Sequence, residues 1–398
     1  MRSVPTTAEN ILVTISGPDR PGITARLMDL LATTGAGMHD VEQIVIRGRL
    51  NLSLVITVPR GKDLIKDLLL FAWEQNVDVD FDVVEAADGI TRQLGLVVTV
   101  IGRRVDPNEF GAVAAVVAAH HGNIERIIRL AKYPVWAYEL LVSGPDIEKL
   151  RVALLDLAHE LVCDVAVQRE GLGRRAARLI VLDVDSTLIQ NEIIELLAAE
   201  AGQLDAVAAI TEQAMAGEID FRSSLDARVS LLAGLEEVAI ERAKAGVQFT
   251  PGARIVVRTL KRLGYHVALV SGGFTCVTDY LAAELGLRHA YANTLEIVDG
   301  RLTGRVIGEV VDRATKAAIM SRIAEHEGVS LDQTVAVGDG ANDLDMLSAA
   351  GLGIAFNAKA VVRKAADTSV NVPYLDAILF ILGVRREDIE AADAADPI

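Results

Sequence analysis

Short apolar runs alternate with amphipathic helical patterns through the second half of the chain. Four of these runs have the length of strands, at residues 179–182, 266–270, 334–337 and 352–355. Apolar runs between helical segments are typical of parallel strands that are covered on both faces. The pattern therefore predicts an α/β domain with a parallel sheet wrapped by helices.

Residues 191–247 show a different pattern, in which helical periods follow one another without a strand-like run. This segment begins just after the first predicted strand and the acidic turn that follows it. A helical insertion at this point would lie over the carboxyl edge of the sheet, where open α/β proteins bind their ligands. We therefore expect a helical cap above a ligand site.

The first 170 residues contain an internal repeat at a constant offset of 85, in which residues 13–17 align with residues 98–102. Each copy has the pattern strand, glycine turn, helix, two strands, helix, strand. This is the ferredoxin-like βαββαβ arrangement. The sequence thus predicts two small units of one kind, followed by a polar linker at 170–178 and a larger domain.

Composition and charge narrow the class of protein. The chain is 51% hydrophobic with a formal net charge of −16, which argues against a nucleic-acid-binding surface but allows a small phosphorylated substrate. Its two cysteines, Cys163 and Cys276, lie far apart, as in proteins of a reducing compartment. No segment has the apolar pattern of a signal peptide or of a membrane span. We expect a cytoplasmic protein with no nucleic-acid or membrane partner.

Two aspartates, Asp183 and Asp185, follow the first of the predicted strands. Side chains two positions apart point the same way if the strand geometry continues, so both carboxylates would face one small volume. Like charges at close range raise each other's pKa unless a cation or a shared proton stabilises them. The pair therefore indicates a metal site, acid/base chemistry, or both.

Three further segments lie where a predicted strand ends or a predicted helix begins. They offer a hydroxyl with glycine amides, a cation, and a second acidic turn: Ser271 with Gly272, Lys316, and Asp339 with Asn342 and Asp343. Glycine amides and a hydroxyl suit phosphoryl oxygens, and carboxylates suit Mg²⁺. Together with the first acidic pair, these are the parts that phosphoryl transfer needs.

In this order, the four motifs resemble those of the haloacid dehalogenase superfamily of phosphatases. That superfamily carries Asp-x-Asp-x-Thr or Val, then Ser or Thr, then Lys, then a Gly-Asp turn with further acids. Within it the chain is similar to the phosphoserine phosphatases, through residues 183–187, Glu192 and Arg228. The resemblance covers residues 178–390 and implies a Rossmann-like core with a helical cap at 191–247.

The resemblance implies hydrolysis of O-phospho-L-serine to L-serine and phosphate, the last step of serine biosynthesis, with Mg²⁺ as cofactor. Asp183 would attack phosphorus to give an aspartyl phosphate, and Asp185 would protonate the leaving oxygen and then activate water. The metal would be held by Asp183, the backbone carbonyl of Asp185, and Asp339. The substrate would be bound by Glu192 at its ammonium, by Arg228 at its carboxylate, and by Ser271, Gly272, Lys316 and Asn342 at its phosphoryl group.

The repeated units resemble tandem ACT domains, regulatory modules that bind an amino acid at an interface between units, with expected bounds of 8–90 and 91–168. The resemblance rests on the Gly-Pro-Asp-Arg-Pro-Gly turn of residues 17–22. It implies L-serine as an effector and a homodimer, because such units complete their sheets by pairing. The effector would lie near Asp19, with Gly17, Arg20 and Gly22 around it. In the second unit, residues 102–108 lack the matching aspartate and the closing glycine, which puts effector binding by that loop in doubt.

Two alternatives stay open from the residues alone. A related enzyme that hydrolyses another small phosphate ester, or that transfers the phosphoryl group to an alcohol, would carry the same four motifs. An amino-acid-sensing regulator with an inactive catalytic half would carry the same repeats. Turnover of a panel of phosphate esters separates these classes.

Overall fold

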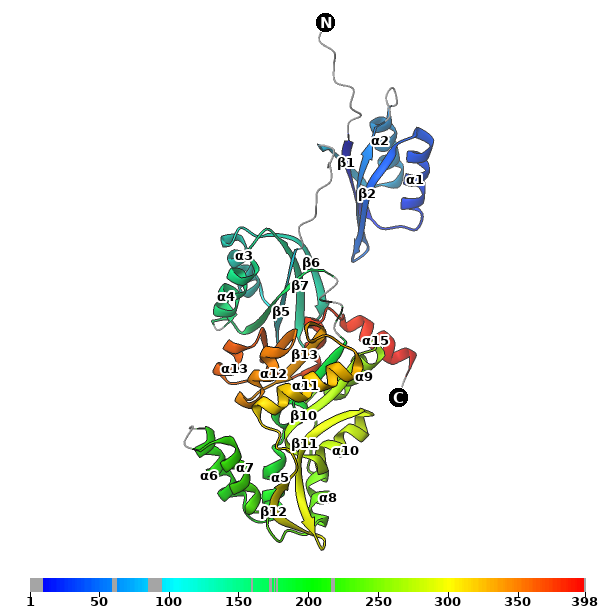
Figure 1. Ribbon diagram of the computed structural model, residues 1–398. Coiled ribbons are helices and arrows are strands. Elements are labelled where there is room, and N and C mark those ends of the chain that lie inside the picture. Colours follow the sequence, from blue (N-terminus) through cyan, green and yellow to red (C-terminus); the bar gives the residue numbers. More distant parts are fainter. Residues whose placement is uncertain are drawn as a thin grey trace. The chain divides into compact units, whose positions relative to one another are not determined.

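The computed structural model describes residues 10–58, 63–84, 95–158, 160–171, 174, 176, 178–215 and 219–396. The chain divides into two compact units, residues 1–92 and 93–398, and each is described by itself (Figure 1). Residues 8, 9 and 85–94, which contain the expected boundary between the two repeats, lie outside the described residues, as do residues 172, 173, 175 and 177 of the expected linker.

The first unit is one βαββαβ repeat. Its elements are β1 (Asn10–Pro18), α1 (Ile23–Thr34), β2 (Gly37–Ile46), β3 (Arg49–Thr57), α2 (Leu64–Gln75) and β4 (Asp78–Val84). The antiparallel sheet has the order β2-β3-β1-β4, and alternate residues of β1 and β3 are buried against the two helices. This alternation is expected for a sheet with one covered face, and the predicted pattern is confirmed.

The second repeat has the same topology. Its elements are β5 (Leu96–Gly102), α3 (Pro107–Ala119), β6 (Asn123–Ala131), β7 (Trp136–Ser143), α4 (Ile147–Ala158) and β8 (Cys163–Arg169), and its sheet has the order β6-β7-β5-β8. Ile15 pairs with Leu52, and Val100 pairs with Tyr138. The offset is therefore 85 at the first strand but 86 at the third, so the constant offset of 85 was wrong by one residue there. The error matters, because a shift of one residue exchanges the two faces of a strand.

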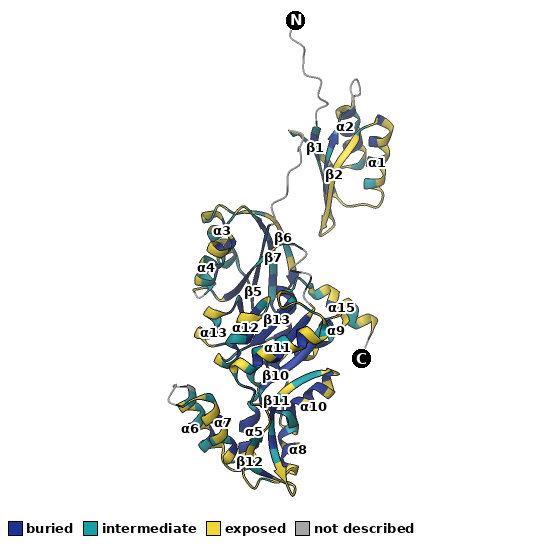
Figure 2. Cartoon of the chain, in the orientation of Figure 1, coloured by how far each residue is buried: buried dark blue, intermediate teal, exposed yellow. Residues whose placement is uncertain are grey.

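The third domain contains a seven-stranded sheet of order β12-β11-β10-β9-β13-β14-β15. The strands are β9 (Leu179–Leu182), β10 (His266–Phe274), β11 (His289–Val298), β12 (Arg301–Ile307), β13 (Thr334–Gly338), β14 (Leu352–Phe356) and β15 (Thr368–Val370). All neighbours are parallel except β11 and β12, which form an antiparallel hairpin. Alternate residues of β9 enter apolar clusters on opposite faces of the sheet. The predicted parallel sheet covered on both faces is confirmed (Figure 2).

Helices cover both faces of this sheet and form the cap. The covering helices are α9 (Ala253–Arg262), α10 (Thr275–Leu285), α11 (Arg313–Glu327), α12 (Leu344–Ala349), α13 (Ala360–Ala365), α14 (Ile378–Ile381) and α15 (Arg386–Ala395), with short helical turns at Val184–Leu188, Leu331–Gln333, Ala341–Asp343 and Leu375–Ala377. The cap consists of α5 (Ile193–Glu200), α6 (Leu204–Met215), α7 (Phe221–Ser230) and α8 (Val238–Ala245). Among the described residues, no helix has the length and apolar character of a membrane span.

The sheet of the second repeat packs on the third domain. Ile101, Ala137 and Ala166 belong to the same buried apolar cluster as the core of that domain. Arg174, from the expected linker, donates to Glu139 of β7 at 2.6 Å and to the carbonyl of Ile381 at 3.1 Å. The second repeat is therefore joined to the third domain by apolar packing and by the partly buried hydrogen bonds of Arg174.

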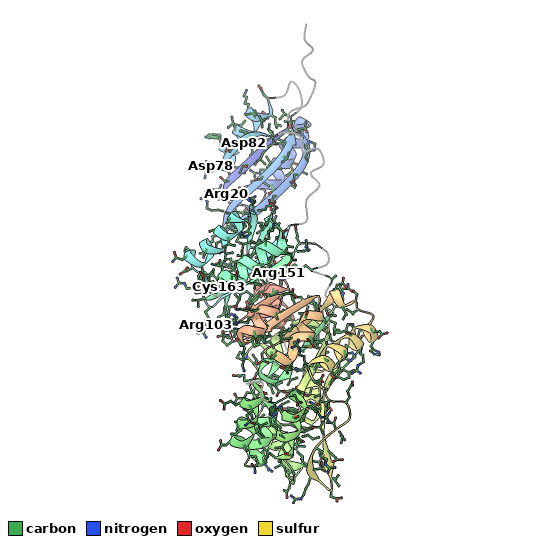
Figure 3. All side chains as sticks on the ribbon, turned by 60° about the vertical axis from the view of Figure 1, so that its left-hand side comes forward. Arg20, Asp78, Asp82, Arg103, Arg151 and Cys163 are labelled. Atoms are coloured by element: carbon green, nitrogen blue, oxygen red, sulfur yellow. The ribbon has the colours of Figure 1, made fainter. Side chains whose placement is uncertain are left out.

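A buried carboxylate lies at this junction. Asp164 of β8 accepts the backbone N–H of Asn371 at 2.7 Å and its side-chain amide at 2.5 Å. A second contact between the second repeat and the third domain is an ion pair of 3.2 Å between Arg151 of α4, labelled in Figure 3, and Asp367. In the first repeat the position equivalent to Asp164 is Asp78, which is exposed on β4. The same acidic position is thus buried in the second repeat, which contacts the third domain, and exposed in the first repeat.

We expect this junction to depend on pH. Burial is the main cause that raises the pKa of Asp164 to about 6, and the hydrogen bonds from Asn371 oppose it. A carboxyl whose pKa is higher in the folded state stabilises the fold fully below about pH 4, and this contribution is lost as the pH rises through about 6. Urea unfolding of the wild type and of Asp164→Asn should therefore differ by a free energy that changes by roughly 2 kcal/mol between about pH 4 and 7. A difference that stays flat over this range contradicts the prediction.

Candidate active site

The first aspartate of the pair, Asp183, lies at the end of β9 and is buried. Lys316 of α11 is also fully buried, and its Nζ donates to Oδ1 of Asp183 at 2.5 Å and to Oδ1 of Asp343 at 2.7 Å. Burial lowers the pKa of Lys316, but the two carboxylates outweigh this effect, so the net shift is upward and the amine stays charged. Residues 133 positions apart are thereby joined at the carboxyl edge of the sheet.

Three carboxylates gather beside this lysine. Oxygens of Asp183, Asp339 and Asp343 lie within 4.8 Å of one another, which is close enough to ligate one cation. Burial and the neighbouring Asp343 raise the pKa of Asp339 to about 7 and that of Asp183 well above its ordinary value. A divalent cation would stabilise these charges, so the donor set fits a metal that prefers oxygen ligands. Asp343, which was not among the three expected metal ligands, lies within the cluster itself.

Asp185 has different surroundings from Asp183. Its Oδ1 accepts the backbone N–H of Ile193 at 2.7 Å, and its Oδ2 accepts the hydroxyl of Ser271 at 2.9 Å. Burial is the main cause that raises its pKa, and these two hydrogen bonds oppose the shift. The Ser271 hydroxyl also accepts the N–H of Gly273 at 2.8 Å. Among the described residues, the donors to the second carboxylate are therefore neutral, as suits a group that gains and loses a proton.

Glu192 and Arg228 lie at the cap side of the site. The hydroxyl of Ser186 donates to Oε1 of Glu192 at 2.7 Å, and Ser186 takes a left-handed backbone conformation with φ of 56° to do so. Burial, followed by the charge of Asp185, raises the pKa of Glu192 to about 7. Burial lowers the pKa of Arg228, against the opposing charges of Glu192 and Asp185. The structure thus brings both predicted substrate-recognition residues to the acidic pair.

The irregular segment of β10 between Val270 and Phe274 is covered by residues of the cap and of the second acidic loop. A Cβ atom placed on Gly272 would lie 3.7 Å from Cζ of Phe221 and 3.8 Å from Nδ2 of Asn342. The predicted residues Gly272 and Asn342 are therefore neighbours, with an aromatic ring of α7 beside them. An apolar ring here would keep water from the reacting groups.

Asn293 of β11 is a site residue that the sequence patterns did not reveal. It is fully buried, donates to the carbonyl of Gly272 at 2.8 Å, and accepts the N–H of Val311 at 2.8 Å. Val311 lies just before α11, so Asn293 joins Gly272 of β10 to the helix that carries Lys316. The one available signal was its residue type, because asparagine is uncommon inside strands.

The expected effector residues lie together on the first unit. Asp19 and Arg20 are exposed in the turn between β1 and α1, and Arg20 is labelled in Figure 3. Gly22 has φ of 95°, which favours glycine, and a Cβ on Gly17 would lie only 2.8 Å from the side chain of Val77. Gly22 is therefore required by the conformation of this turn, and Gly17, near the end of β1, by the space that Val77 occupies.

Comparisons with known proteins match all three parts of the chain. The family described as haloacid dehalogenase-like hydrolase matches residues 180–348, and ACT-domain families match residues 9–82 and 95–168. A phosphoserine phosphatase of Streptomyces coelicolor is 55% identical over 96% of this chain and 94% of its own length. Phosphoserine phosphatase SerB2 of Mycobacterium tuberculosis is 48% identical over 97% of this chain and 96% of its own length.

Solved structures agree with this match. A probable phosphoserine phosphatase from Vibrio cholerae, in unliganded form, is 35% identical and covers 75% of this chain and 89% of its own chain, with a TM-score of 0.57. A substrate-bound phosphoserine phosphatase complex is 45% identical and covers 51% of this chain and 97% of its own chain, with a TM-score of 0.50.

Proposed function

The chain belongs to the phosphoserine phosphatase family, with a haloacid dehalogenase-like hydrolase domain after two ACT domains, and we propose how its residues divide the work of hydrolysis. Its activity is hydrolysis of a phosphoric monoester, O-phospho-L-serine, through an aspartyl phosphate. The observation that carries our assignment of roles is the unequal environment of the two aspartates. The ammonium of Lys316 donates to Asp183 and opposes the rise of its pKa, whereas the neutral Ser271 hydroxyl and a backbone amide donate to Asp185.

Asp183 is the nucleophile. Its carboxylate attacks phosphorus, and the bond between phosphorus and the seryl oxygen breaks as the acyl phosphate forms. Asp185 gives its proton to that departing oxygen, and the raised pKa supports such a role. In the second half, Asp185 takes a proton from the water that attacks the acyl phosphate, which returns Asp183 as a free carboxylate.

The remaining polar groups of the site stabilise the negative charge of the phosphoryl group and hold the metal. Ser271, the amide of Gly272, Lys316 and Asn342 surround the phosphoryl oxygens, where they stabilise the charge of the transition state. Mg²⁺ is the cofactor that fits the oxygen ligands of Asp183 and Asp339, with the backbone carbonyl of Asp185, and it would supply further positive charge there. The proximity of Asp343 to these oxygens supports it as an additional ligand.

Glu192 and Arg228 select the serine part of the substrate. A carboxylate and a guanidinium on the cap side of the acidic pair match an ammonium and a carboxylate, and a guanidinium fork binds a carboxylate with two hydrogen bonds. We expect Arg228→Lys to lower kcat/KM for O-phospho-L-serine by about 10–100-fold. For phosphoethanolamine, which has no carboxylate, Arg228→Lys should lower kcat/KM much less. For phosphoglycolate, which has no ammonium, Glu192→Gln should leave kcat/KM unchanged. Equal losses on all three esters would contradict these roles.

The first ACT domain carries the effector site, with L-serine as the ligand. Gly22 provides no side chain to cap α1, so its first amides are available to a carboxylate, and Asp19 can accept from an ammonium. In the second ACT domain, Asp106 already accepts from the amides of Asn108 and Glu109 at 2.8 and 3.1 Å. This supports one effector site per chain, in the first domain.

Calorimetry on the full chain tests this site. We expect one L-serine to bind per chain, and we expect Asp19→Ala to weaken binding by at least about 10-fold, because a charge-assisted hydrogen bond contributes about 1.5–3 kcal/mol. Asp106→Ala is the matched control, since it removes the cap of α3 and should leave the affinity unchanged. No heat of binding from L-serine or any other amino acid would contradict the assignment.

A homodimer is the proposed assembly. All ten residues of β2 are exposed, and it is an edge strand that carries apolar side chains, including Met38, Ile44 and Ile46 at 50–61% exposure (Figure 2). Such an edge is a template for pairing with another strand, and a second copy offers the same strand. Light scattering should give twice the mass of one chain. A single-chain mass at all concentrations would refute this assembly.

The cytoplasm is the proposed location, consistent with the two free cysteines.

A further inference from the structure

The hairpin of β11 and β12 is joined to the cap by backbone hydrogen bonds. The N–H of Gly234 donates to the carbonyl of Leu302 at 2.8 Å, and the N–H of Leu302 donates to the carbonyl of Leu235 at 2.9 Å. The N–H of Glu237 donates to the carbonyl of Gly300 at 2.9 Å. Figure 1 shows β12 at the same end of the domain as the cap helices. The segment after α7 is thus paired along β12.

One glycine permits a closer contact between β12 and α7. Gly304 has φ of +82°, and a Cβ atom placed on it would lie 2.9 Å from Cβ of Ala233 and 3.2 Å from Cα and from the carbonyl oxygen of Ser230. Backbone and a short rigid side chain cannot move aside as a long side chain can. Gly304 is therefore required both by its conformation and by the space that the end of α7 occupies.

The end of α7 is where Arg228 is held. Arg228 lies two residues before Ser230, in the last turn of the helix. Its Nε donates to the carbonyl of Ser224 at 3.3 Å, so the guanidinium is tied to its own helix and moves with it. The position of α7 against β12 thus sets the position of the guanidinium in the site.

We propose that Gly304 is a positioning residue for substrate selection: the close approach of β12 to the end of α7 places Arg228 at the carboxylate of phosphoserine. This inference rests on the role of Arg228 in the proposed function. A two-bond contact of a guanidinium fork with a carboxylate tolerates little displacement, and a misplacement of about 1 Å far from the chemistry can be costly.

The test compares two glycines of similar backbone conformation. Gly308 has φ of +81°, and no atom of the described residues lies within 4 Å of a Cβ placed on it. Gly308→Ala therefore strains the backbone as Gly304→Ala does, without the contact at α7. We expect Gly304→Ala to lower the ratio of kcat/KM for O-phospho-L-serine to that for phosphoethanolamine by about 10-fold, and Gly308→Ala to leave this ratio unchanged.

A compensating variant separates positioning from a general loss of structure. Ala233→Gly removes the nearest atom, so Gly304→Ala with Ala233→Gly should recover most of the ratio. Where Gly304→Ala does not fold, Ala233→Val presses on the same contact from the cap side, without a strained backbone, and should lower the ratio in the same direction.

Three results overturn the inference in different ways. If Arg228→Lys collapses the ratio and neither Gly304→Ala nor Ala233→Val changes it, the contact at Gly304 does not position Arg228. If Arg228→Lys itself leaves the ratio unchanged, the proposed role of Arg228 fails, and the inference loses its premise. The inference is also overturned if Gly304→Ala lowers kcat/KM equally for both esters and the double variant does not recover it.

Discussion

The enzyme with Asp183→Asn should lose at least about 10³-fold in kcat for O-phospho-L-serine, because an amide cannot form the acyl phosphate. Its fold should persist. Burial and the charge of Asp343 raise the pKa of Asp183, so a neutral amide removes an unfavourable charge from the metal-free protein. We expect its free energy of unfolding in metal-free buffer to be no lower than that of the wild type.

Acid quenching separates the roles of the two aspartates. The wild type, quenched during turnover of labelled substrate, should retain phosphate that hydroxylamine releases, and Asp183→Asn should retain none. Asp185→Asn should still be phosphorylated by p-nitrophenyl phosphate, whose leaving group needs no proton, and should accumulate the intermediate because water is not activated. Labelled protein from Asp183→Asn would show that another group attacks phosphorus.

The site was predictable from sequence because its chemistry is carried by residue types at the ends of strands. Asp183, Ser271 and Asp339 each follow an apolar run, and parallel strands bring their carboxyl ends to one edge. Strand periodicity and glycine turns likewise indicated the sheet and both repeats. These signals are local, and the fold brings them together.

Contacts between distant segments left no such local signal. The hydrogen bonds of Asn293 depend on where Gly272 and Val311 meet in space, and Asp343 enters the acidic cluster through the turn after β13. Asp164 and Asp78 are aspartates at equivalent strand positions of the two repeats. The sequence alone therefore does not tell that Asp164 is buried against the third domain and that Asp78 is exposed. Tertiary contact decides such cases, and no sequence period encodes it.

Lys316→Met should cost both activity and stability. The ammonium of Lys316 is the cation that the described structure places between Asp183 and Asp343, all three buried. Its loss leaves two buried carboxylates without their partner, which typically costs about 3–5 kcal/mol of folding free energy. Loss of a cation at the phosphoryl group should lower kcat by at least about 10²-fold. Urea unfolding and steady-state kinetics measure the two effects.

The double variant shows whether charge is the cause. Since Asp343→Asn removes one of the two unpaired carboxylates, Lys316→Met with Asp343→Asn should be more stable than Lys316→Met alone, although it should remain inactive. Lys364→Met, at an exposed position in the last turn of α13, is the matched control and should change stability by less than about 0.5 kcal/mol. If the double variant is no more stable than the single one, lost packing of the lysine stem accounts for the destabilisation. Recovery in the double variant assigns it to the unpaired carboxylates, and thus to the ion pairs through which Lys316 also opposes the rise in the pKa of Asp183.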